Sequence, residues 1–127
     1  MQINSAKDLI VYKRAYELSM RIFQLTKSYP SEERYALTSQ VRRSSRSICL
    51  NLREAWAKRH YPAAFIAKLT DCDGENSETD SSLDFARDCG YIDRAERAKL
   101  SRVSAEIGRM LGSLIRKPAG FPLTSNL

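Results

Sequence analysis

The stretch QVRRSSRSICLNLREAWAKR, residues 40–59, places apolar and small residues every three or four positions among six cations. That spacing lines one face of an α-helix, because 3.6 residues make one turn. One side of this helix must therefore meet a core while its charges stay outside. The stripe comprises Leu37, Val41, Ser44, Ile48, Leu52 and Ala55.

Three other segments repeat this periodicity, and the residues between them are ones that end or start helices. Pro30 and Pro118 interrupt the pattern, while Gly90 suits the position just past a helix end. Pro62 suits the first turn of a helix. We therefore predict helices at about 8–28, 32–59, 62–89 and 94–117, followed by a loose tail at 118–127.

Two of the helix starts carry side chains that can satisfy free N–H groups. Ser31 can cap the second helix, and Asp93 with Glu96 resembles a capping box for the fourth. Short connections between four amphipathic helices favour antiparallel neighbours. The prediction is an all-α, antiparallel up-down-up-down four-helix bundle, a single domain over residues 1–127.

The net charge of +6 is divided unevenly along the chain. Residues 34–60 hold seven Lys or Arg against one acid, and residues 94–127 hold seven against two. Residues 61–93 hold two Lys or Arg against eight acids. Basic blocks suggest affinity for polyanions, and opposite blocks suggest that one meets the other, within the fold or between subunits.

Composition also limits the setting of the protein. No apolar run of 18 residues and no signal-peptide region occurs, so we expect a cytoplasmic protein without a membrane partner. The cysteines Cys49, Cys72 and Cys89 are odd in number and lack C-x-x-C spacing. We expect reduced, half-buried thiols that pack as small hydrophobes.

Arginines form two rows on the predicted helices. Arg42, Arg46 and Arg53 lie within about 40° of one another on a helical projection, away from the apolar stripe, and Arg43 lies beside them. Arg102, Arg109 and Arg116 are seven residues apart on the fourth helix. Such rows can donate to phosphates. The alternatives are a solvated face or a salt-bridge seam between subunits.

Polar residues near the stripes need partners if they are buried. We expect an interhelical hydrogen-bond network that contains Gln40, Asn51, Glu54, Asn76 and Glu78. A di-iron site would need two Glu-x-x-His motifs, whereas the chain has one histidine, His60. We therefore expect no metal, no other cofactor and no catalytic residues.

Three blocks carry a resemblance to a known family: DLIVYKRAYEL, YPSEERYALTSQVRRSSRSICLNLREA and GENSETDSSLDFARDCGYI. Together they resemble the 23S rRNA intervening-sequence (S23) family over nearly all of residues 8–117. The middle block is the most specific. Its matching positions are Tyr29, Pro30, Glu33, Arg34, Tyr35, Leu37, Ser39, Gln40, Arg42, Arg43, Asn51 and Glu54.

The resemblance implies a bundle that forms a ring, typically a pentamer, with no established enzymatic activity. It also implies a relation to the accessory protein of diversity-generating retroelements, which binds nucleic acid and a reverse transcriptase. A second similarity is weaker: Arg53 and His60 match the loose R-x4–6-H pattern of HEPN-type ribonucleases, which are also helical bundles.

We expect a non-enzymatic, self-associating bundle whose basic surface binds RNA or DNA with little sequence specificity, as an accessory protein. The alternatives are a purely structural protein–protein interaction module and a ribonuclease that uses Arg53 and His60.

Overall fold

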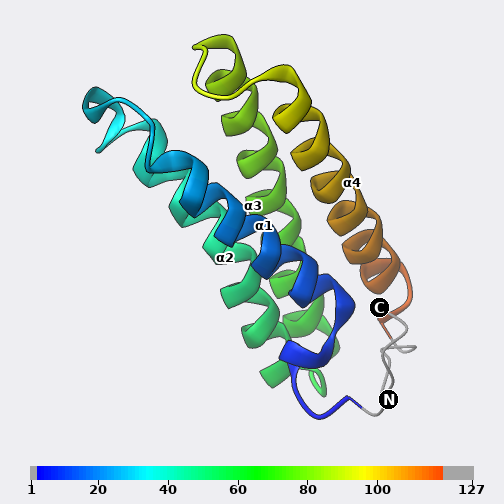
Figure 1. Cartoon of the computed structure of the whole chain (residues 1–127). Helices are drawn as coiled ribbons and strands as arrows, with labels where there is room; N and C mark the ends of the chain where they lie inside the picture. Colours follow the sequence, from blue (N-terminus) through cyan, green and yellow to red (C-terminus); the bar gives the residue numbers. More distant parts are fainter. Residues whose placement is uncertain (1–2, 119–127) are drawn as a thin grey trace.

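The computed structural model describes residues 3–118, and its main elements are four α-helices. Figure 1 shows that successive helices run in opposite directions, and no strand occurs within residues 3–118. The predicted all-α bundle is confirmed. The helices are α1 (Ile10–Thr26), α2 (Leu37–Ala57), α3 (Pro62–Asp88) and α4 (Arg94–Arg116).

Each helix packs against two others. α1 and α3 both contact α2 and α4, whereas the diagonal pairs make no close backbone contact within the described part of the chain. The core is filled by the apolar stripes, including the predicted α2 residues Val41, Ile48 and Leu52, which are at most 1% exposed. Burial of each such side chain contributes about 1.5–3 kcal/mol.

The predicted start of the second helix at residue 32 is wrong. Residues Ser31–Glu33 form a short 3-10 helix, and α2 begins only at Leu37 because Ala36 has a non-helical φ of −124° and ψ of −107°. Ser31 does not cap α2. The carboxylate of Glu33 instead accepts a long, 3.4 Å hydrogen bond from the Leu37 N–H.

The connection between α3 and α4 follows the predicted pattern. Gly90 has a φ of +79°, and the N–H groups of Gly90 and Tyr91 donate to the carbonyls of Arg87 and Ala86. This pair of bonds is the Schellman motif, which requires a left-handed residue after the helix. Asp93 then caps α4 by accepting from the Glu96 N–H at 2.7 Å, whereas the Glu96 carboxylate pairs with Arg21, so the reciprocal half of the predicted capping box is absent among the described residues.

Three further expectations concern membrane spans, the cysteines and the C-terminal tail. None of the helices in the described residues is long and apolar enough to cross a membrane. Cys49 and Cys72 are buried, and burial raises the pKa of each thiol to about 12, whereas Cys89 is exposed. Residues 119–127 of the predicted tail lie outside the described residues.

Candidate nucleic-acid interface

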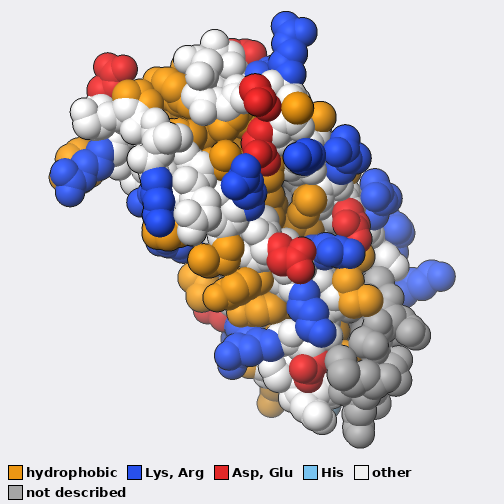
Figure 2. Space-filling view, in the orientation of Figure 1, with side chains coloured by type: hydrophobic (Ala, Val, Ile, Leu, Met, Phe, Trp, Pro, Cys, Tyr) orange, Lys and Arg blue, Asp and Glu red, His pale blue; other side chains and the backbone are white. Residues whose placement is uncertain are grey.

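The α4 row, Arg102, Arg109 and Arg116, lies on the solvent side of its helix. All three arginines are exposed, and none has a carboxylate partner within residues 3–118. Seven residues of helix rise about 10.5 Å, so the row spans about 21 Å. Lys and Arg side chains gather along this edge of the bundle in Figure 2.

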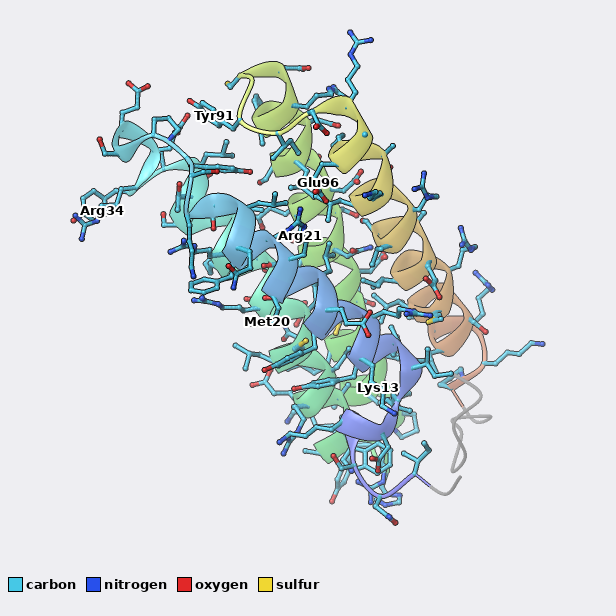
Figure 3. All side chains as sticks on the ribbon, in the orientation of Figure 1. Lys13, Met20, Arg21, Arg34, Tyr91 and Glu96 are labelled. Carbon is cyan, nitrogen blue, oxygen red and sulfur yellow. The ribbon has the colours of Figure 1, made fainter. Side chains whose placement is uncertain are left out.

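The row is free of carboxylates because the acids of α4 face α1. Glu106 pairs with Arg14 at 3.3 Å, and Glu96 pairs with Arg21. Figure 3 shows Arg21 and Glu96 extending toward each other from α1 and α4. The hydrogen bond from Arg21 holds the pKa of the Glu96 carboxyl below its usual range.

Small residues accompany the α4 row. Ala98 and Ala105 are exposed, and Gly112 follows at the same seven-residue spacing. A Cβ at Gly112 would lie 3.1 Å from Nη1 of Arg116, so the glycine leaves room for that guanidinium against the helix. The side chains beside the row are therefore short and leave the three arginines accessible to a polyanion.

The α2 row, Arg42, Arg46 and Arg53, has different surroundings. Arg42 is half-buried, and its Nε donates to the Thr26 hydroxyl of α1 at 2.8 Å. The guanidinium carbons of Arg42 and Arg46 lie 4.9 and 5.8 Å from the centre of the Phe23 ring. Arg42 departs from the expectation that this row points away from the bundle, because α1 packs alongside it, whereas Arg46 and Arg53 are exposed.

Arg53 and Arg43 lie on different sides of α2 and contact different helices. Arg53 lies within hydrogen-bonding reach of the Tyr12 side chain; burial raises the pKa of Tyr12, and Arg53 opposes that rise. Arg43 faces α3, where it pairs with Glu75 at 3.2 Å and Glu78 at 2.7 Å. Arg43 is thus engaged by the fold and does not join the other three arginines.

The predicted single polar network is also wrong. Gln40 is exposed, the amide of Asn51 donates to the Ser47 carbonyl of its own helix, and Glu54 pairs with Lys68 at 3.1 Å on the surface. Glu78 pairs with Arg43, as above. Gln40 and Glu54 are exposed and Asn51 is half-buried, because all three lie on the flank of the apolar stripe of α2 and not within it.

Only Asn76 of that set is buried. Its amide donates to the Ser104 carbonyl at 2.9 Å, and the Ser104 hydroxyl donates back to its oxygen at 3.1 Å. A second buried bond joins the hydroxyls of Ser44 and Thr79 at 2.8 Å. Ser44 and Thr79 both occupy positions within the apolar stripes of the sequence, and those positions indicate their burial.

Arg97 was not selected from the sequence, although it is the most enclosed arginine described. Its side chain is 7% exposed, and it donates to Asp84 at 2.9 Å and Asp80 at 2.8 Å on α3. Its Nη1 is buried and has no hydrogen-bond partner among the residues that the structure describes. The available signal was its spacing from Leu100 and Ser104, which puts Arg97 on the inner face of α4.

The two residues of the ribonuclease alternative, Arg53 and His60, lie in different parts of the fold. His60 is exposed in the turn between α2 and α3, whereas Arg53 lies at the α1–α2 edge beside Tyr12. In the described part of the chain, no group of three or more His, Cys, Asp or Glu residues could hold a metal ion.

Comparison with known proteins agrees with this architecture. The family model described as 23S rRNA-intervening sequence protein matches residues 7–113. The chain belongs to this family. A crystal structure of an S23 ribosomal protein family member of unknown function, from Bacteroides thetaiotaomicron, is 31% identical to this 23S rRNA-intervening sequence family protein, with a TM-score of 0.75. The match covers 84% of this chain and 96% of that one. No curated protein matches.

Proposed function

We propose that this family member binds RNA or DNA through the α4 row, with little sequence preference, as a non-enzymatic accessory protein. The observation that supports this proposal is the exposure of Arg102, Arg109 and Arg116 along one line without carboxylate partners in residues 3–118. Each phosphate that such an arginine neutralises releases counterions, which favours binding at low salt.

The dimensions of the row suit a nucleic-acid backbone. A duplex presents phosphates every 3.4 Å of axis per strand, so a row of about 21 Å passes about six of them. Arginine donates as a planar fork, which matches phosphate oxygens. The small residues Ala98 and Ala105 beside the row offer no group for reading base edges. Contacts of this kind position a protein on the backbone without specifying sequence.

Self-association accompanies this proposal, and the family resemblance suggests a pentameric ring. Copies arranged in a ring would present several α4 rows to one strand and increase avidity. The resemblance to the accessory protein of diversity-generating retroelements extends the proposal to a reverse transcriptase as a partner. The exposed side chains of Tyr16 and Met20 on α1 favour the second candidate function, a protein–protein interaction module.

The test is a salt titration of a variant without the α4 row. Arg102→Gln/Arg109→Gln/Arg116→Gln should keep its helix content, because the three side chains are exposed and Gln is a good helix former. Binding to a labelled 20-nucleotide DNA or RNA should weaken for all sequences alike. The slope of log affinity against log salt should shrink by roughly two to three, about 0.7–0.9 per lost contact.

The matched control is Arg14→Gln/Arg21→Gln/Arg43→Gln, which removes three charges that carboxylates already neutralise. Its salt slope should change much less. Equal slopes for the two triple variants would show that net charge alone attracts the nucleic acid. If only Arg42→Gln/Arg46→Gln/Arg53→Gln lowers the slope, phosphates bind the α2 row instead and the α4 assignment is wrong.

A further inference from the structure

A groove runs along α2 from the residues that follow the short 3-10 helix. Its volume of about 520 Å³ is within the range of roughly 300–1,000 Å³ that is usual for small-molecule sites. None of the described residues that line this α2 groove is acidic. Arginines and Ser or Thr side chains predominate, so the groove suits a ligand with negative charge. The arginines are Arg34, Arg42, Arg43 and Arg46.

Two of these arginines lie one helical turn apart and point to the same place. The guanidinium carbons of Arg42 and Arg46 are 4.9 and 5.8 Å from the centre of the Phe23 ring. Neither arginine pairs with a carboxylate within residues 3–118. The bond to Thr26 uses only Nε of Arg42, which leaves its Nη groups for another acceptor. Neighbouring guanidinium groups with such donors can hold one phosphate together.

Tyr35 provides an aromatic surface at the start of the groove. It is 84% exposed, and the guanidinium carbon of Arg34 lies 5.2 Å from the centre of its ring. Figure 3 shows Arg34 extending away from the helices at this end of the bundle. Aromatic rings and guanidinium planes both stack on nucleobases, and they do so whichever base is present.

The part of the groove between these two ends is polar. Ser39 lies between Tyr35 and Arg42 along the chain, and its hydroxyl donates to the Ala36 carbonyl at 3.2 Å. The oxygen of Ser39 can still accept a bond from a sugar hydroxyl. From Ser39 to Arg46 the helix rises about 10.5 Å. A phosphate ion alone would fill only a small part of this length, whereas a sugar and a base would fill more of it.

We propose that the α2 groove binds a nucleoside phosphate, with its base against Tyr35 and its phosphate on Arg42 and Arg46. A free nucleotide and one nucleotide of a single strand both present this chemistry. A duplex does not, because its bases are stacked on one another inside the helix. The groove is separate from the α4 row, since α2 and α4 make no close backbone contact in the described part of the chain.

Calorimetric titrations of the full chain test the base end of the groove. The probes are adenosine 5′-monophosphate, a single-stranded hexanucleotide and a duplex of the same length. Tyr35→Ala should raise the dissociation constant of a probe that enters the groove at least about fivefold, because a stacked base is lost. Tyr35→Phe keeps the ring and should bind like the wild type. Tyr35 is exposed, so both variants should keep the helix content of the wild type in circular dichroism.

The probes distinguish the two sources of the ligand. Weaker binding of adenosine monophosphate by Tyr35→Ala would identify a free nucleotide as the ligand. Weaker binding of the single strand, with no binding of the monophosphate by the wild type, would identify a nucleotide within a strand. The proposal is wrong if Tyr35→Ala changes neither dissociation constant, or if it weakens the duplex as much as the single strand.

The phosphate end has a matched control on the same helix. Arg46→Gln should raise the dissociation constant of the probe that binds about tenfold, because a charged donor to the phosphate is lost. Arg53→Gln removes the same charge from an exposed position of α2 that does not line the groove, and it should change binding much less. Equal effects of the two substitutions would mean that net charge alone attracts the probe, which would overturn the phosphate assignment.

These results are independent of the α4 row. The Tyr35 variants carry the same charge as the wild type, so their difference cannot come from general attraction of a polyanion. Arg102→Gln/Arg109→Gln/Arg116→Gln should bind adenosine monophosphate like the wild type. If that variant also binds the single strand like the wild type, the proposed function fails while the groove stands. If instead the Tyr35 variants are identical, the groove assignment fails while the proposed function stands.

Discussion

The α4 row and the α2 row are two sets of three arginines on one bundle, and they meet different surroundings. The α4 row lies in solvent beside small residues, while the acids of its helix pair with α1. The α2 row lies along α1, where Arg42 bonds to Thr26 and approaches an aromatic ring. The neighbouring helix, more than spacing along a helix, therefore determines which arginines of a row gain a partner within the fold.

Arg97 is the most enclosed arginine of the described residues, and it bonds to two carboxylates of α3. Its replacement should therefore have the largest effect on stability. Arg97→Gln should lower the free energy of unfolding by about 2–3 kcal/mol, because charged hydrogen bonds to Asp80 and Asp84 are lost. Arg109→Gln, on the same helix, should change it by less than about 0.5 kcal/mol. Urea denaturation measures both, and equal losses would remove the distinction between inner and outer arginines.

Arg42 should show an intermediate effect. Arg42→Gln should destabilise the bundle by about 1 kcal/mol, because it loses the bond to Thr26 and the contact with Phe23. Thr26 keeps its bonds to the Ile22 and Phe23 carbonyls, which limits the loss. Arg102→Gln is the matched variant from the α4 row and should be close to neutral. If both variants are neutral, the α2 row is as free as the α4 row.

The ion pair between Arg21 and Glu96 should give the smallest effect, one that depends on pH. Because the folded pKa of Glu96 is lowered, chiefly by the bond from Arg21, its stabilisation is present above the ordinary glutamate pKa of about 4.3. That stabilisation is lost as the pH falls through the lowered value. Arg21 is half exposed, so the contribution is at most about 1 kcal/mol.

Melting temperatures of the wild type and Glu96→Gln between pH 7 and pH 3 measure this contribution. The two proteins should differ at neutral pH and converge in acid. A constant difference across this range would mean that Glu96 stabilises α4 by some means other than its charge.

Local rules were sufficient for the existence and direction of the helices. The stripe of α2, Pro62 at the start of α3, Gly90 after its end and Asp93 at the start of α4 depend on residues within one or two turns of each other. The start of α2 was misplaced because Pro30 and Ser31 also suit a short 3-10 helix. The residues of both arginine rows were also identified from spacing alone.

The partners of polar and charged residues came only with the tertiary structure. A helical projection places a residue on its own helix but does not say which helix lies opposite. Arg97 meets Asp80 and Asp84 across the turn at Gly90, and Asn76 meets Ser104 from 28 positions away. Arg42 bonds across to Thr26, whereas Arg102 faces solvent, although both lie away from the apolar stripes of basic helices. Periodicity thus determined the four helices and their two rows, while packing determined which arginines of those rows gain a partner on a neighbouring helix.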